Sequence, residues 1–300
     1  GFSKTIGLTW NGQYQLTQVL TNGVSVERNG YDALGRRVWS WDGSTTNYMV
    51  YDGQQIIAEV DRTGGLRRSY VWGPGIDNLL AMTVYTGATT KTYFALTDLL
   101  RSVHAMVDET GAIVESYRYD AWGRVLGVYT WNGQPLAESA IGNRVLWQGK
   151  MYSWRTGFYD NRARWYDPIT GRFLSKDPGG ICNGLNEYAY CYNNPVNFVD
   201  PDGEAALDAN EAFSYWEAVG VAGQERGGFS GNLQTAGASL AVAFIDFWGA
   251  RDVQGRASDS GYYSANEACH GKAWRSGLMT VGMIGLAAIT GGGKEQILSR

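Results

Sequence analysis

The first half of the chain alternates apolar and polar positions over short stretches. Segments such as RRVWSW, QIIAEV, LRRSYVW and AIVESYRY carry this period of two, which is typical of strands that bury one face. Turn sequences separate them at 42–43, 52–53, 64–65 and 110–111. We therefore expect residues 1–155 to be almost wholly antiparallel β, with strand pairs reversing at these turns.

The same region is repetitive. Two pieces nearly repeat, YDALGRRV at 31–38 and YDAWGRVL at 119–126. A period near 20 residues with strand patterning indicates one hairpin per repeat, and a lone hairpin is marginal in water, so each should pair with the next in a continuing sheet. Tyrosines recur at this period and should pack along one face: Tyr31, Tyr51, Tyr70, Tyr93 and Tyr117.

The motif Tyr-Asp-x-x-Gly-Arg resembles the YD repeat of the RHS and teneurin family. The segments TGFYDNRARWYDPITGRFLSKDP (156–178) and GLNEYAYCYNNPVNFVDPDG (184–203) resemble its RHS-repeat-associated core. The resemblance covers about residues 24–204. It implies a mainly β fold in which YD-repeat hairpins form a spiralling antiparallel shell, and the core plugs one end. Arg101 stands where many family members have glycine, so one turn departs from the pattern.

Three parts follow from this organisation. Residues 1–155 are expected to form the repeat sheet, and residues 156–204 the core. Residues 205–300 are richer in glycine and alanine, and we expect a smaller, mainly helical segment there. Its apolar stretches at 236–249 and 277–293 are shorter than the roughly 20 residues that span a bilayer.

We expect the parts of these stretches at 240–249 and 277–290 to be buried against protein. The alternative is insertion of the C-terminal segment into a membrane during delivery, since small-residue apolar helices associate there. No sequence motif in the segment identifies an enzymatic activity.

Two Asp-Pro pairs lie within the core, at Asp177 and Asp200. Each is followed by a glycine three residues after the aspartate, at Gly180 and Gly203. One interpretation is turn chemistry, because aspartate ahead of proline is extended and its side chain caps nearby amides. The other is that two carboxylates meet at a site. Asp167-Pro168 is a third such pair, which we interpret as a hairpin turn only.

The resemblance supports the second interpretation. In toxin-related members of the family, the core is an aspartyl-type autoprotease that cuts its own chain just beyond the last Asp-Pro-x-Gly. It implies that Asp177 and Asp200 form the catalytic dyad and that Arg164 supports them. Two carboxylates in one site cannot both ionise, so one acts as acid and the other activates water. A salt bridge between strands is the alternative role for Arg164.

One position departs from the family pattern. Self-cleaving members usually have leucine after the last Asp-Pro-x-Gly and are cut after it, whereas this chain has Glu204 followed by Ala205. A carboxylate beside the dyad adds like charge and lacks the apolar body of leucine. The bond between Glu204 and Ala205 is the expected cleavage position, but this departure favours a core that does not cut.

Composition narrows the partners. The net charge is −4 with no basic run, so we expect no nucleic-acid partner. The three cysteines and two histidines show no metal-ligand spacing, and we expect neither metal nor cofactor. The chain begins in the middle of a strand pattern, as a piece of a longer protein would.

Two functions remain open at this stage. The first is a secreted or cell-surface RHS shell segment that encloses its own C-terminal segment as cargo, with release by self-cleavage near residue 204. The second is a structural or adhesive extracellular β-assembly whose core is only a plug. A secretion system or a cell-surface protein would be the further partner in either case.

Overall fold

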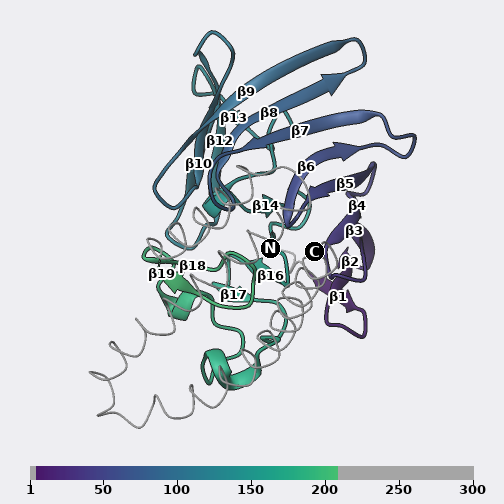
Figure 1. The fold of residues 1–300 in the computed structure, drawn as a ribbon, viewed down its shortest axis with the longest axis vertical. Coiled ribbons are helices and arrows are strands. Elements are labelled where there is room, and N and C mark those ends of the chain that lie inside the picture. Colours follow the sequence, from purple (N-terminus) through teal and green to yellow (C-terminus); the bar gives the residue numbers. More distant parts are fainter. Residues whose placement is uncertain (1–4, 209–300) are drawn as a thin grey trace, which may run out of the picture. The chain divides into compact units, whose positions relative to one another are not determined.

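The computed structural model of the chain describes residues 5–208, and its largest element is an antiparallel sheet of 13 strands paired in chain order (Figure 1). This confirms the expected mainly β fold built from successive hairpins. Its strands are β1 (Ile6–Trp10), β2 (Leu16–Thr21), β3 (Val24–Tyr31), β4 (Arg37–Trp41), β5 (Thr46–Asp52), β6 (Gln55–Val60), β7 (Leu66–Trp72), β8 (Leu79–Thr86), β9 (Thr89–Thr97), β10 (Val103–Val107), β11 (Ile113–Tyr119), β12 (Val125–Thr130) and β13 (Pro135–Leu136).

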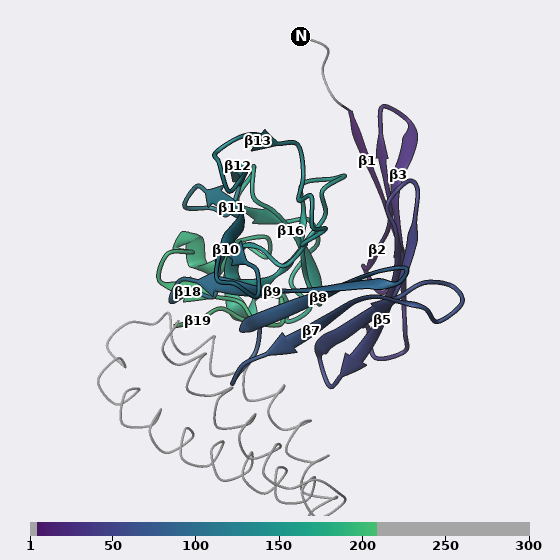
Figure 2. The ribbon, with the colours of Figure 1, turned by 90° about the horizontal axis from the view of Figure 1, so that it is seen from above.

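The sheet buries one face, as the alternation predicts. Met82 and Met106 are fully buried, whereas Leu80 and Phe94 on the same strands or their neighbours are exposed. The sheet curls, and the strands of the core lie on its concave side (Figure 2). The hairpins reverse between β4 and β5, β5 and β6, β6 and β7, and β10 and β11, at the four expected turns.

The core is built from short elements. A four-stranded sheet contains β14 (Met151–Tyr152), β15 (Tyr159–Asn161), β16 (Arg164–Asp167) and β17 (Arg172–Phe173), and β18 (Phe198–Val199) pairs with β19 (Leu207–Asp208). Two turns of 3₁₀ helix accompany these strands, η1 (Trp147–Gly149) and η3 (Cys191–Asn193), and another, η2 (Gly180–Asn183), follows Asp177 in the chain.

The repeat sheet ends at Leu136, so residues 137–155 are not part of it. Most of 137–150 is irregular, and Met151 already belongs to the core sheet. The irregular segment is held by a buried carboxylate: Glu115 of β11 accepts the Ser139 hydroxyl at 2.7 Å and the Ile141 amide at 3.1 Å. A side chain therefore satisfies backbone groups that a strand partner would otherwise bind.

Aromatic rings concentrate in the core. Trp147 lies within 6.0 Å, between ring centroids, of Tyr159, Tyr166 and Tyr190. All four side chains are buried, and they share one apolar cluster with Met82, Met106 and other side chains of the sheet. The core and the concave face of the sheet thus bury each other.

Four of the five periodic tyrosines fall into two classes, and Tyr93 is a buried member of the apolar cluster. Tyr31 and Tyr51 follow a bulge, and each donates its hydroxyl, at 2.9 Å, to a backbone carbonyl of the strand that directly precedes its own in the sheet. Trp72 and Tyr119 occupy the equivalent position. Tyr70 and Tyr117 lie two residues earlier and bond instead to the buried carboxylates of Glu59 and Glu115.

The turn at Arg101 keeps the geometry of the glycine turns. Arg101 has a φ of 69°, its amide donates to the Asp98 carbonyl at 3.1 Å, and the Asp98 carboxylate accepts the Ser102 amide. Gly35 and Gly123 occupy this position in the two YD repeats, with φ of 82° and 83°. The substitution therefore leaves the turn intact but places a side chain in the left-handed region.

Residues 5–180 and 186–208 belong to one compact unit, and residues 181–185 to another. The first residues expected to be helical include Leu207 and Asp208, which are instead a strand because they pair with Val199 and Phe198. The expectations for 209–300, including burial of 240–249 and 277–290, lie outside the described residues. Within the described part of the chain, no helix is long and apolar enough to cross a bilayer.

Candidate functional site

Three segments of the core bring the expected site residues together. Arg164 opens β16, Asp177 follows β17 in a loop, and Asp200 follows β18 directly. One Nη atom of Arg164 lies 3.1 Å from Asp177 Oδ2, and the other lies 3.3 Å from Asp200 Oδ2. All three side chains are nearly inaccessible to solvent. One buried guanidinium therefore bridges the two carboxylates.

The guanidinium has little freedom to move. Its plane lies over the Phe173 ring, with Cζ 3.6 Å from the ring centroid, a stacking that suits a flat, weakly hydrated cation. Nη1 donates to the Glu187 carbonyl at 3.3 Å, and Nε donates to the Gly203 carbonyl. The donors of Arg164 are thus divided among two carboxylates and two backbone carbonyls.

Each aspartate also closes its own turn. Asp177 Oδ1 accepts the Gly179 amide at 2.7 Å, and Asp200 Oδ1 accepts the Gly203 amide at 2.7 Å. Asp167 differs, because its two oxygens accept the Ile169 amide and the Thr170 hydroxyl. The two interpretations of the Asp-Pro pairs therefore hold together: one oxygen caps the turn, and the other faces Arg164.

The surroundings of Asp200, above all its burial, favour its protonated form. Burial raises the pKa of Asp200 to about 7, and the nearby Asp202 carboxylate adds to the rise. Arg164, Lys150 and the Gly203 amide oppose it without reversing it. The pKa of Glu204 is also raised, by burial first and then by Asp202 and Asp177. Asp200 is thus poised to hold and release a proton near neutral pH.

The backbone of 200–203 is bound carbonyl by carbonyl, chiefly by the turn between β15 and β16. We call this arrangement the carbonyl clamp, formed by residues 161–164 together with Lys150. Its bonds run in order: Asn161 Nδ2 to the Asp200 carbonyl at 2.9 Å, Lys150 Nζ to the Pro201 carbonyl at 2.6 Å, Arg162 Nη1 to the same carbonyl, the Ala163 amide to the Asp202 carbonyl at 2.9 Å, and Arg164 Nε to the Gly203 carbonyl.

Gly203 is required at the end of the clamp. Its φ is 79°, and a Cβ there would lie 2.2 Å from the Asn161 carbonyl oxygen and 3.0 Å from the Arg164 nitrogen. Any other residue would combine backbone strain with a clash against backbone. This close approach holds the Gly203 carbonyl beside the guanidinium that bridges the two carboxylates.

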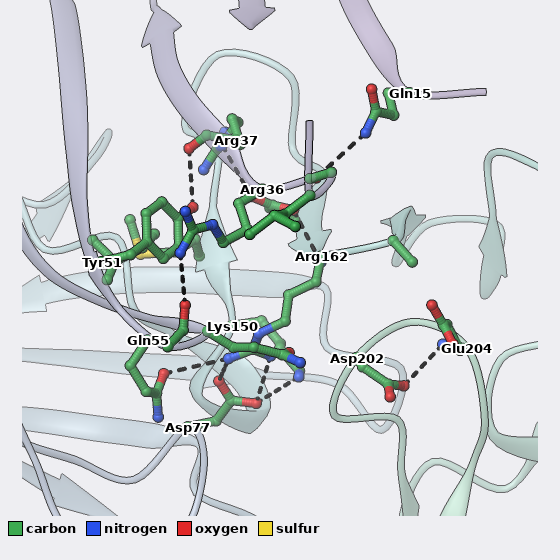
Figure 3. A pocket seen from close by; sticks show the side chains of 18 of the residues that line it. Gln15, Arg36, Arg37, Tyr51, Gln55, Asp77, Lys150, Arg162, Asp202 and Glu204 are labelled. Carbon is green, nitrogen blue, oxygen red and sulfur yellow. Dashed lines mark hydrogen bonds and ion pairs between the residues drawn. The ribbon is translucent and has the colours of Figure 1, made fainter. Parts of the chain in front are cut away.

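Sequence reasoning missed Lys150, which belongs to the clamp, and Asp77, which binds Lys150. Both are buried, and Lys150 Nζ lies 2.6 Å from Asp77 Oδ2, while Arg162 binds the other oxygen at 2.6 Å (Figure 3). Asp77 comes from the connection between β7 and β8, some distance from the core in sequence. The Gly-Lys pair at 149–150 was the only local signal, and it does not indicate a partner.

A cavity of about 570 Å³ adjoins the clamp, with Asp77, Lys150 and Arg162 among its lining residues and Asp202 and Glu204 at its edge (Figure 3). Its cations and carboxylates neutralise one another. Within residues 5–208, no group of three or more His, Cys, Asp or Glu side chains is arranged to hold a metal ion.

Comparisons with known proteins agree with this architecture. The family model described as the teneurin YD-shell matches residues 5–196. The chain is 30% identical over 259 residues to the tRNA nuclease WapA of Bacillus subtilis, covering 72% of this chain and 11% of WapA. It is 30% identical over 232 residues to the double-stranded DNA deaminase toxin A of Burkholderia cenocepacia, covering 68% and 16%.

Among solved structures, the crystal structure of TcdB2-TccC3-Cdc42 shares the fold with a TM-score of 0.54 at 24% identity, over 66% of this chain and 10% of that one. The chain thus spans about a tenth to a sixth of the length of these proteins. The hairpin sheet, the enclosed core and the matched family model lead to one conclusion: this chain belongs to the RHS/YD-repeat family, as part of its teneurin-type YD shell.

Proposed function

We propose that this segment closes one end of an RHS shell and cuts its own chain between Glu204 and Ala205, which releases the C-terminal segment as cargo. One observation carries the proposal: the Arg164 guanidinium contacts both Asp177 and Asp200 and also binds the Gly203 carbonyl. Two buried carboxylates and an anchored backbone are the parts that aspartyl-type hydrolysis needs.

In the proposed reaction, Asp177 takes a proton from a water molecule, and the water oxygen bonds to the Glu204 carbonyl carbon. Asp200, which is partly protonated near neutral pH, gives its proton to the Ala205 nitrogen as the C–N bond breaks. The products are a new carboxyl group at Glu204 and a new amino group at Ala205. The clamp contributes by holding the preceding backbone still, which lowers the entropic cost of reaching the transition state.

The cargo and the setting are proposed by analogy. The names of two relatives describe a tRNA nuclease and a DNA deaminase toxin, and we propose that residues after 204 are, or lead into, a cargo of the toxin class. The parent protein would then act outside the cell that makes it, as a secreted or surface protein. A secretion system would be its delivery partner, and membrane contact would fall to the C-terminal apolar stretches.

A second candidate function is a core that plugs the shell without cutting. Glu204 favours it, because its carboxylate lies in the field of Asp202 and Asp177 and adds negative charge where water must be activated. In this alternative, the bridged carboxylates only hold the loops after β17 and β18 together.

Intact mass of the purified chain tests the proposal. We expect the 32.9 kDa chain to convert into two pieces that meet between residues 204 and 205. Asp177→Asn and Asp200→Asn should each abolish the conversion. Asp167→Asn is the matched control, because Asp167 is also a buried aspartate before proline but lies outside the site. An uncut wild-type chain would leave the plug function, and equal cutting in all three variants would show that Asp177 and Asp200 do not carry out the cleavage.

A further inference from the structure

We infer that Asp77, a residue of the repeat sheet, is a positioning residue for the cleavage segment: it orients Lys150 and Arg162, which together hold the Pro201 carbonyl. The inference deepens the proposed self-cleavage and rests on it for its catalytic meaning. Its structural content, that the sheet fixes the 200–204 backbone, stands on contacts alone.

A short chain of contacts connects Asp77, between β7 and β8, to the backbone of 200–204. Asp77 Oδ2 binds Lys150 Nζ at 2.6 Å and Arg162 Nη1 at 3.1 Å, and Oδ1 binds Arg162 Nη2 at 2.6 Å (Figure 3). Lys150 Nζ then donates to the Pro201 carbonyl at 2.6 Å, as does Arg162 Nη1. One carboxylate therefore sets the position of two donors that share one acceptor.

The two cations need this carboxylate to stay in place. Lys150 is 3% exposed and lies close enough to Arg162 that burial and the guanidinium both lower the pKa of Lys150. Burial disfavours the ionised form of Asp77, but Arg162 and Lys150 hold its pKa below the usual value. Without the negative charge, the buried Lys150 and the partly exposed Arg162 would repel each other around a single carbonyl.

The backbone around Asp77 is shaped for this contact. Asp77 has a φ of 60°, which few non-glycine residues adopt. Gly149, next to Lys150, approaches it so closely that a Cβ would lie 2.0 Å from the Asp77 carbonyl oxygen. Strain and close approach at one contact indicate that the surrounding structure demands it.

A functional consequence follows from where Asp77 lies in the chain. The carboxylate that binds both Lys150 and Arg162 comes from the connection between β7 and β8, and the core alone does not supply it. The clamp is complete only after this part of the sheet has folded against the core. Cleavage would then follow shell formation, and the cargo would not be cut from an unfinished shell.

The experiment compares Asp77→Asn with Glu59→Gln. Glu59 is the matched control because it is also a buried carboxylate of the sheet, paired with Arg144 at 2.6 Å, and it does not touch the clamp. Two readouts are measured in the full chain: the rate of cleavage, and hydrogen exchange of the amides in 199–205 in chains that also carry Asp177→Asn. Thermal unfolding of each variant shows whether it is folded.

Asp77→Asn should slow cleavage by about 10²-fold, the scale of a small misplacement of a reacting group, and should speed exchange in 199–205 about tenfold through the weakened charged bonds. Glu59→Gln should alter neither readout to this extent. Arg162→Gln, whose side chain is partly exposed, serves if Asp77→Asn does not fold. Adding Asp77→Asn to Arg162→Gln should cost less than the sum of the two.

The two proposals fail in different ways. If the wild-type chain does not cut, the proposed self-cleavage is wrong, and exchange in 199–205 alone decides the positioning role. If Asp77→Asn cuts at the wild-type rate, or if its exchange in 199–205 equals that of Glu59→Gln, the positioning role of Asp77 is wrong whatever the protease does.

Discussion

At the scale of single residues, the aspartates of the core divide their two oxygens between two tasks. In Asp177 and Asp200, one oxygen accepts a turn amide and the other faces Arg164. The turn bond fixes the rotamer, so the second oxygen is aimed at the guanidinium at no further entropic cost. A turn residue becomes a candidate catalytic residue only because a cation lies opposite it.

The raised pKa of Asp200 predicts how stability depends on pH. Its pKa is about 7 in the folded chain against an ordinary value of 3.8, so the folded state binds this proton more tightly. The stability that the protonated form contributes is complete below pH 3.8 and is lost as pH rises to about 7. We therefore expect Asp200→Asn to melt at a higher temperature than the wild type, by a difference that widens as pH rises across this window. A gap that stays constant from pH 4 to pH 8 would contradict the assignment.

The carboxylate of Glu204 beside the candidate site predicts that replacing this residue speeds cleavage. Replacing Glu204 by leucine removes a carboxylate from the field of Asp177 and Asp202 and restores the apolar residue of the family pattern. We expect faster cutting, measured as the cleaved fraction over time. Glu204→Gln removes the charge but not the polarity, so it separates the two effects. Slower cutting in Glu204→Leu than in the wild type would show that Glu204 is not the obstacle.

The positive φ of residue 101 predicts that glycine there gives a more stable chain than alanine. This φ of 69° costs an ordinary residue about 1 kcal/mol or more that glycine does not pay. Arg101→Gly should therefore unfold at a higher temperature than Arg101→Ala, which loses the same side chain beyond Cβ but keeps the strain. Equal melting temperatures for the two variants would show that the backbone there is relaxed.

At the scale of elements, the turn between β15 and β16 acts as a template for the backbone after β18. Residues 161–164 donate hydrogen bonds, one residue after another, to the carbonyls of 200–203, as one strand does to its neighbour. A loop held this way needs no regular secondary structure, because every carbonyl already has a donor. The candidate cleavage position follows immediately after this held segment.

Two glycines test the template. Gly203→Ala and Gly111→Ala place a Cβ at nearly the same φ, 79° and 83°. A Cβ at residue 203 would meet backbone at 2.2 Å, whereas at residue 111 nothing lies within 4 Å. We expect Gly111→Ala to cost about 1 kcal/mol of unfolding free energy. Gly203→Ala should cost at least 1 kcal/mol more and stop cleavage. Equal losses in urea unfolding would mean that the loop moves away from the clamp freely.

At the scale of the whole molecule, the sheet and the core form one buried system. Trp147, Tyr166 and Tyr190 share their apolar cluster with Met82 and Met106 of the sheet. Buried carboxylates of three sheet strands, Glu27, Glu59 and Glu115, all bind groups in 139–156. Glu27 and Glu115 each stand four residues before the tyrosine of a Tyr-Asp pair, and this spacing was the sequence signal available for them. In the repeat at Tyr51, the same position holds Asn47.

This interdependence predicts that the core does not fold alone. Residues 137–208 expressed by themselves would expose the aromatic cluster and lose the carboxylates of the sheet. We expect no near-ultraviolet circular dichroism signal from the fragment and a clear signal from residues 5–208. A cooperative thermal transition in the isolated fragment would contradict this, and would also remove the reason for cleavage to wait for the sheet.

The sequence by itself determined the hairpin sheet, because alternation and turn residues act between near neighbours. Its motifs also indicated the family, and the resemblance to that family implied the grouping of Arg164, Asp177 and Asp200, which lie within 37 residues. Tertiary structure alone decided which distant residues hold the backbone beside these three side chains and where the sheet ends. Asp77 and Lys150 are 73 residues apart, and the end of the sheet at Leu136 depends on Glu115 reaching 139–141. Such contacts form only when the sheet curls over the core, and no local pattern of residues encodes a partner that distant.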